Sequence, residues 1–159
     1  TQYLSALEKQ PQVVEIVAFC LMNNHFHFLL KQIQENGIST FISQITNGYT
    51  KYFNTKHDRS GYLFQGTFKA VHVNSDEQLL HLSRYIHLNP VMSFLIKLEE
   101  LVNYPWSSYP SYVDASNSRM VSSQLINGFF SNKNSYSKFV LDHVDYARQL
   151  KEIKDLLLE

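Results

Sequence analysis

The feature that most constrains the fold is a pair of apolar stretches joined by Asn23-Asn24. Val13–Met22 is rich in β-branched and apolar residues, which favour a buried strand. Asn-Asn is a turn signal, and His25–Lys31 has the length and composition of a second strand. The segment therefore predicts an antiparallel β-hairpin.

Two histidines, His25 and His27, stand in the second strand of this predicted hairpin. Residues i and i+2 of a strand face the same side of the sheet, with Cα atoms about 7 Å apart. Two imidazoles at this spacing can converge on one divalent cation. The alternative is two polar residues on an exposed strand face, and a lone His-x-His does not decide between them.

Two further segments predict helices. Apolar residues recur at helical spacing from Gly37 to about Thr55. Ser75-x-x-Gln78 is a capping box that opens a second helix, and its first turn carries two acids where the helix dipole favours them. Because the residue before Pro90 avoids the α region, this helix is predicted to run from about Asp76 to Leu88.

The rest of the chain is less regular, and the pattern as a whole predicts an α+β fold with helices packed on an antiparallel sheet. The remaining predicted elements are the end of a helix at 2–9, a loop at 57–61, an extended segment at 64–73, an aromatic loop over the core at 104–112, a linker with a short helix at 113–128 and one or two amphipathic helices at 136–158.

Composition and charge limit the class of protein. A chain of 159 residues with 44% apolar residues suits one domain with a single core. Cys20 is the one cysteine, which predicts a reducing cytoplasm, and no apolar run is long enough to cross a membrane. A net charge of zero argues mildly against a nucleic-acid partner. Residues 51–69 contain four basic residues and a single acid, Asp58. The basic residues are Lys51, Lys56, Arg59 and Lys69. On charge alone, a solvated surface is the favoured interpretation.

The helix predicted from Asp76 carries a polar stripe, because His81, Tyr85 and Asn89 follow one another at intervals of four residues. A tyrosine and an amide on one stripe are unusual for packing alone. The alternative is that Tyr85 is a core aromatic, that Asn89 ends the helix, and that His81 fills surface.

Four longer motifs carry a family resemblance: "AFCLMNNHFHFLL", "YFNTKHDRSGYLFQGTFKA", "LLHLSRYIHLNPV" and "YPWSSY". Together they resemble the REP-associated tyrosine transposases, relatives of the single-tyrosine transposases among the HUH nucleases. The resemblance covers roughly residues 10–112. It implies a ferredoxin-like HUH domain over 1–112, with a helical extension of that domain over 113–159.

The resemblance also implies roles for single residues. His25, His27 and Asn89 would be ligands of a divalent metal, Mg²⁺ or Mn²⁺, and Tyr85 would be the nucleophile that forms a 5′-phosphotyrosine. A free tyrosine costs about 4 kcal/mol to ionise at pH 7, and a nearby cation lowers that cost. The implied partner is hairpin-forming, single-stranded DNA from a palindromic repeat. The implied setting is the bacterial cytoplasm and nucleoid, as a monomer or a homodimer.

The same resemblance favours a DNA-binding role for the basic middle of the chain. Phosphate contacts are expected from Lys51, Lys56, Arg59, Lys69 and Arg84. Tyr62 is expected to stack on an unpaired base, whereas core packing is favoured for Phe64.

The chain departs from the family pattern in three places. Asn23 replaces the usual Pro, and Met92-Ser93-Phe94 replaces Arg-Ala-Gly. The family's first strand is expected to be absent, either because the sequence is a fragment or because another segment replaces that strand. A sheet without it would have an unpaired edge. Two other functions therefore stay open: a DNA-binding protein of the same fold that no longer cuts, and an unrelated metal hydrolase that uses the histidines alone.

Overall fold

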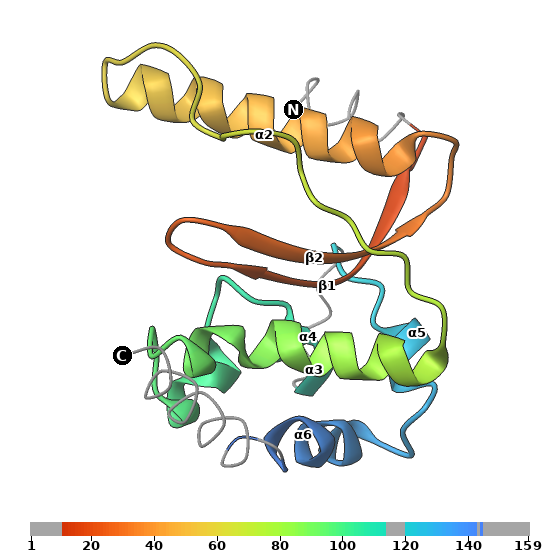
Figure 1. Cartoon of the computed structure of the whole chain (residues 1–159). Coiled ribbons are helices and arrows are strands. Elements are labelled where there is room, and N and C mark those ends of the chain that lie inside the picture. Colours follow the sequence, from red (N-terminus) through yellow and green to blue (C-terminus); the bar gives the residue numbers. More distant parts are fainter. Residues whose placement is uncertain (1–10, 114–119, 143, 145–159) are drawn as a thin grey trace, which may run out of the picture. The chain divides into compact units, whose positions relative to one another are not determined.

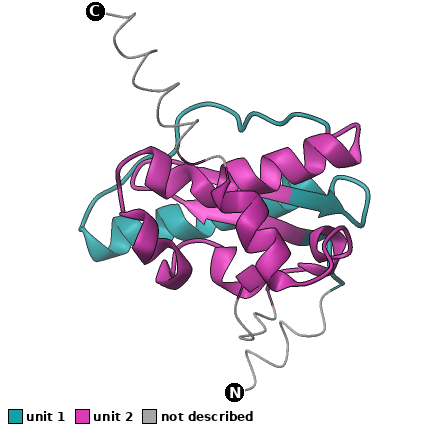
Figure 2. Ribbon diagram, turned by 90° about the horizontal axis from the view of Figure 1, so that it is seen from below, with its two compact units in different colours: residues 1–15, 30–72 teal, residues 16–29, 73–159 magenta. Residues whose placement is uncertain are grey.

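The computed structural model describes residues 11–113, 120–142 and 144. The chain divides into two compact units, the first formed by residues 1–15 and 30–72 and the second by residues 16–29 and 73–159 (Figure 2). The helix end predicted at 2–9 lies outside the described residues, as does most of the helical region predicted at 136–158.

The predicted hairpin is confirmed, with each strand boundary within one residue of its expected position. β1 (Val14–Leu21) and β2 (Phe26–Gln32) form a two-stranded antiparallel sheet (Figure 1). The N–H of Met22 donates to the carbonyl of His25 at 2.9 Å, which closes a two-residue turn. β2 therefore begins at Phe26, the residue that follows His25.

Segments from later in the chain cover the edge of β1 that points away from β2. The N–H of Leu21 donates to the carbonyl of Trp106 at 2.7 Å, and the N–H of Ser108 donates to the carbonyl of Phe19 at 3.0 Å. Cys20 and Ser107 form an isolated antiparallel bridge between these two bonds. Residues 106–108 therefore occupy the end of this edge of β1, which reduces the unpaired backbone available for edge-to-edge association.

Helices of the second unit pack on the hairpin around one apolar core. They are α3 (Asp76–Met92), the 3₁₀ helix η1 (Leu98–Asn103), α4 (Tyr109–Val113), α5 (Gln124–Asn127) and α6 (Lys133–Leu141). α3 packs against η1, α5 and α6, and α4 packs against η1 and α6. The core joins Val17 and Ala18 of β1 to Ile86 of α3 and Tyr136 of α6. The α+β class with helices packed on an antiparallel sheet is confirmed.

α3 begins as predicted but ends later. The Ser75 hydroxyl accepts a hydrogen bond from the N–H of Gln78 at 3.1 Å. The prediction that the helix stops at Leu88 is wrong, because α3 continues through Pro90 to Met92. Proline removes one helical N–H and disfavours the helical conformation of the residue before it. Burial of Asn89, Pro90 and Val91 against the core outweighs that local preference.

The aromatic loop predicted at 104–112 packs on the core, but it is partly helical. Tyr109 and Tyr112 are buried, and both belong to α4. Pro110 lies in the first turn of α4, where its missing N–H breaks no helical hydrogen bond. η1 was not predicted from the sequence.

The first unit consists of α2 (Gly37–Lys56), the outer ends of the two strands and the segment that follows α2. A Cβ on Gly37 would overlap the carbonyl oxygen of Val13, so the start of α2 approaches the strand too closely for any other residue. Residues 57–61 form the predicted loop, and 64–73 contain no regular strand. Of the described helices in either unit, none has the length and hydropathy needed to cross a bilayer.

Candidate active site

The candidate site lies within the second unit, between the start of β2 and the middle of α3. The rings of His25 and His27 are adjacent, with centroids 4.9 Å apart and planes at 89°. The ring of His27 also contacts that of Tyr85, with centroids 5.6 Å apart and planes at 78°. The structure thus brings together the histidine pair and the tyrosine that the sequence singled out.

α3 presents Tyr85 to this pair because neighbouring positions of the helix are anchored in the core. Ile86 is 4% exposed, whereas Tyr85 is 55% exposed. The phenol therefore has one side against His27 and the other open to solvent.

Hydrogen bonding engages one nitrogen of His25. Nδ1 of His25 lies 2.7 Å from the side-chain oxygen of Asn24, which can only accept, so the histidine donates from Nδ1. In the neutral form of the His25 ring, Nε2 then carries a lone pair. Nε2 of His27 is buried and has no hydrogen-bond partner among the described residues.

The local environment keeps His27 uncharged. Burial lowers the pKa of His27 below its ordinary value, and the neighbouring His25 lowers it further. A neutral imidazole is the form that binds a metal ion. Within the described residues no three His, Cys, Asp or Glu side chains group as metal ligands. A cation at this pair would therefore need further oxygen ligands of another kind, such as an amide, a phosphate or water.

Asn89 lies one helical turn beyond Tyr85, about 6 Å further along the axis. Its side chain is 6% exposed, and its Oδ1 accepts a hydrogen bond from the hydroxyl of Ser93 at 3.4 Å. An amide oxygen is a hard ligand that suits Mg²⁺ or Mn²⁺. Asn89 is thus on the helix that carries Tyr85, with its oxygen held by a single long hydrogen bond.

Arg84, expected at a DNA phosphate, is placed differently. It is 8% exposed, and its guanidinium lies over the ring of Phe139, 4.5 Å from the centroid. It also donates to Nδ1 of His81 at 2.7 Å. The contact with Phe139 connects α3 to α6, and the bond to His81 lies within α3, so both contacts are structural. His81 is also within 3.8 Å of Glu77, as the surface interpretation of this residue predicts.

A buried polar network fixes α3 from the side opposite the site, and the sequence did not reveal it. His87 is fully buried, with Nδ1 2.7 Å from the hydroxyl of Tyr136 and Nε2 2.7 Å from the hydroxyl of Ser108. Ser108 in turn accepts from the N–H of Phe19 in β1 at 2.8 Å. The network joins α3, α6 and β1 through one imidazole.

The protons of this network can be assigned. The Ser83 hydroxyl donates to the carbonyl of Leu80, so it accepts from the hydroxyl of Tyr136 at 3.2 Å. Tyr136 then accepts from Nδ1–H of His87, and Nε2 accepts from Ser108. The Ser108 hydroxyl also has the carbonyl of Phe19 within reach at 3.2 Å, and Nε2 at 2.7 Å is the nearer acceptor. Burial lowers the pKa of His87 to about 3, so the ring is neutral, as this assignment requires. The available sequence signal was a histidine between Ile86 and Leu88, two positions from Tyr85.

The other predicted DNA contacts belong to the first unit, and all are exposed: Lys51, Lys56, Arg59, Tyr62 and Lys69. Tyr62 is 95% exposed, and the side chain of Arg59 donates to its carbonyl at 3.4 Å. Phe64 is half-buried and packs on the exposed Tyr49, with ring centroids 6.2 Å apart, outside the apolar core in which it was expected.

Comparison with known proteins gives one match. The family described as "Transposase IS200 like" matches residues 2–89, more than half of the chain. The matched segment contains His25, His27, Tyr85 and Asn89. No curated protein and no solved structure gives a significant match.

Proposed function

This chain belongs to the family of IS200-like transposases, which process DNA, and we propose that it cuts and rejoins single-stranded DNA through Tyr85. The observation that carries the proposal is the ring contact between His27 and Tyr85 beside a buried, unpartnered imidazole nitrogen. The phenol can supply the nucleophile, and the imidazole nitrogen can help to hold a metal ion that activates a phosphate for attack.

The residues present fit a divalent metal. Nε2 of His27 has no partner among the described residues, and Nδ1 of His25 is held by Asn24, which orients the ring as outer ligands orient metal-binding histidines. We assign His25, His27 and Asn89 as the ligands. When bound, Mg²⁺ or Mn²⁺ would neutralise charge on the scissile phosphate and lower the cost of ionising the phenol.

The chain's own residues account for the remaining chemistry. The oxygen of Tyr85 attacks the phosphorus, the phenolic proton leaves, and the bond to the 3′ oxygen breaks. The products are a 5′-phosphotyrosine and a 3′ oxygen that takes up a proton to become a hydroxyl, so that one proton is lost and one is gained. Because one phosphodiester replaces another, attack by a 3′ hydroxyl reverses the step and rejoins the strand without ATP.

We further propose the REP-associated type of substrate, a DNA hairpin with a single-stranded flank. The family supports DNA as the partner, and the exposed cations and Tyr62 of the first unit supply phosphate and base contacts. Arg84 is left out of this set, because its guanidinium is engaged with Phe139 and His81.

The test uses a labelled hairpin with a single-stranded flank and Mn²⁺, resolved on a denaturing gel. A 3′ label should migrate with the protein, and a 5′ label should give a shortened free strand. Tyr85→Phe should abolish both signals while retaining hairpin binding. Binding without any adduct from the unaltered chain would favour the alternative of a DNA-binding protein that no longer cuts. Cleavage that survives Tyr85→Phe would point to a hydrolase that uses the histidines alone.

A further inference from the structure

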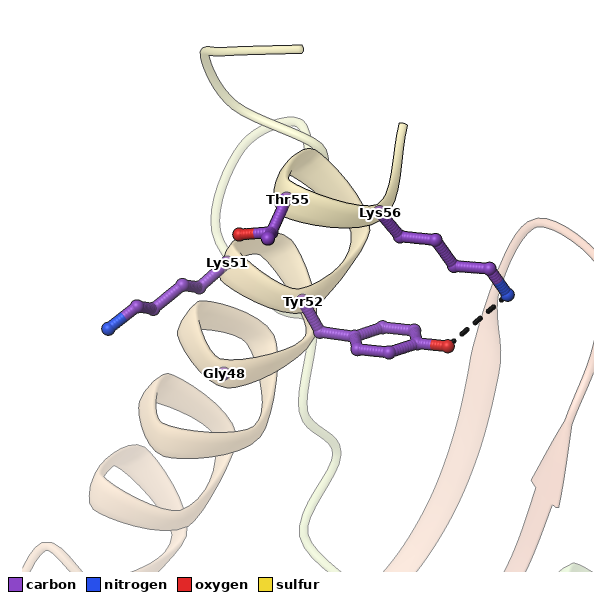
Figure 3. A pocket seen from close by; sticks show the side chains of 5 residues that line it. All are labelled: Gly48, Lys51, Tyr52, Thr55 and Lys56. Atoms are coloured by element: carbon purple, nitrogen blue, oxygen red, sulfur yellow. Dashed lines mark hydrogen bonds between the residues drawn. The ribbon is translucent and has the colours of Figure 1, made fainter. Parts of the chain in front are cut away.

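One face of α2 forms an open hollow of about 510 Å³. Its lining residues are spaced along one side of the helix; they are Gly48, Lys51, Tyr52, Thr55 and Lys56 (Figure 3). Gly48 and Thr55 are small, whereas Lys51 and Tyr52 extend in opposite directions from the helix. We call this hollow the α2 groove.

The charge of α2 is of one sign. Its 20 residues contain no Asp or Glu, and Lys51 and Lys56 are both exposed. Nζ of Lys56 donates to the hydroxyl of Tyr52 at 3.3 Å and lies 5.6 Å from the centroid of that ring. The α2 groove thus combines an aromatic surface with two cations, one of them held beside the ring.

The aromatic surface is not part of the core. Gly37 and Ile42 are the buried residues of α2, and Tyr52 is 57% exposed. Phe53, Phe64 and Tyr52 each contact the ring of Tyr49 at about 6 Å between centroids, and these contacts leave more than half of the Tyr52 side chain exposed. Tyr52 is therefore available to an external partner.

We propose that the α2 groove binds an unpaired nucleotide of DNA, with the base stacked on Tyr52, its phosphate at Lys56 and a more distant phosphate of the same strand at Lys51. This inference rests on the proposed function and deepens it by assigning a binding site for the single-stranded part of the substrate. Stacking tolerates any base, because every base has a π face, and lysines read only the backbone. The α2 groove therefore contributes affinity for single strands without sequence choice.

The ring distinguishes single-stranded DNA from other anionic partners. In a duplex the bases are already stacked, so only the lysines would make contact. An acidic peptide would likewise use the lysines and gain little from the exposed face of Tyr52. Removing the ring should consequently affect single strands far more than either alternative.

The experiment measures binding of the full chain to a fluorescein-labelled 20-nucleotide oligo-dT and to a 20-base-pair duplex, by anisotropy in EDTA so that no strand is cut. Tyr52→Ala should weaken oligo-dT binding about tenfold and change duplex binding less than about twofold. Lys51→Ala should weaken both and lower the salt dependence by about one phosphate contact. Lys138→Ala, which removes an exposed lysine from α6, is the matched control and should leave binding unchanged.

A second variant fills the α2 groove without removing the ring. A Cβ on Gly48 meets nothing within 4 Å, so Gly48→Leu should fold normally and raise helix stability. It should nevertheless weaken oligo-dT binding about as much as Tyr52→Ala does. This variant separates a blocked site from a damaged fold, because its thermal midpoint should not fall.

Oligo-dT binding within about twofold of the unaltered chain for both Tyr52→Ala and Gly48→Leu would overturn the inference. An equal loss for oligo-dT and duplex, or displacement of oligo-dT by poly-glutamate at similar charge concentration, would also overturn it. The proposed cutting activity is read separately, from the covalent adduct at Tyr85. Binding to the α2 groove and cutting by Tyr85 are therefore tested by separate measurements, and failure of one does not imply failure of the other.

Discussion

The ring of His27 lies edge-on to the ring of Tyr85, with centroids 5.6 Å apart. His27 comes from β2 and Tyr85 from α3, much later in the chain, and both elements contribute to the same core through Leu29 and Ile86. The contact is thus a direct consequence of how α3 packs on the sheet, and changes in that packing should reach the proposed chemistry.

The first prediction concerns the metal. His27→Ala should lower Mn²⁺ affinity at least tenfold, because it removes the buried nitrogen that has no hydrogen-bond partner among the described residues. Free Mn²⁺ measured by electron paramagnetic resonance gives the affinity without any DNA. His81→Ala is the matched control, since this exposed histidine bonds Arg84 and Glu77. Equal affinities for the unaltered chain and His27→Ala would exclude this residue as a ligand.

The second prediction concerns the network around His87. Tyr136→Phe removes the hydroxyl that accepts from His87 and donates to Ser83, and it leaves a buried N–H without its partner. The free energy of unfolding should fall by about 1–3 kcal/mol, measured as a lower urea midpoint at constant slope. Tyr109→Phe, whose hydroxyl bonds the partly buried Ser137 at 3.1 Å, should cost less. Equal losses for the two variants would contradict the assigned network.

The third prediction concerns the residue that ends α3. Phe94 has φ 54°, in the left-handed region, where a side chain costs about 1–2 kcal/mol relative to glycine. Its side chain is 64% exposed, so Phe94→Gly gives up little burial and should stabilise the chain by about 0.5–1 kcal/mol. Asn36, at φ 57°, tolerates this conformation, and Asn36→Gly should gain less. Thermal denaturation compares the two, and a lower midpoint for Phe94→Gly would count against the strain.

The fourth prediction concerns alkaline pH. Burial raises the pKa of the Cys20 thiol from 9.0 to about 12, so the native protein keeps the proton while the unfolded chain releases it above about pH 9. The unfolded state then binds fewer protons, and stability falls as the pH rises from about 9 towards 12. The stability difference between the unaltered chain and Cys20→Ala should shift by about 1–2 kcal/mol between pH 8 and pH 10. The buried tyrosines titrate in both proteins and cancel. A difference independent of pH would show that the thiol ionises freely.

Local patterns in the sequence were sufficient for the hairpin, for α2 and for the capped start of α3. Each depends on residues within a few positions of one another: β-branched and apolar stretches with a turn for the strands, apolar spacing for α2, and the capping pair Ser75 and Gln78 for α3. The same patterns marked His25, His27 and Tyr85 as unusual for packing. Their roles in metal binding and attack stay predictions.

Tertiary packing decided what distant residues do to each other. Burial carried α3 past Pro90 against its local preference, placed Arg84 on Phe139, and enclosed His87 between Tyr136 and Ser108. It also left Nε2 of His27 without a partner among the described residues. No spacing rule anticipates these outcomes, because desolvation and hydrogen-bond supply depend on which segments meet, and those segments are far apart along the chain.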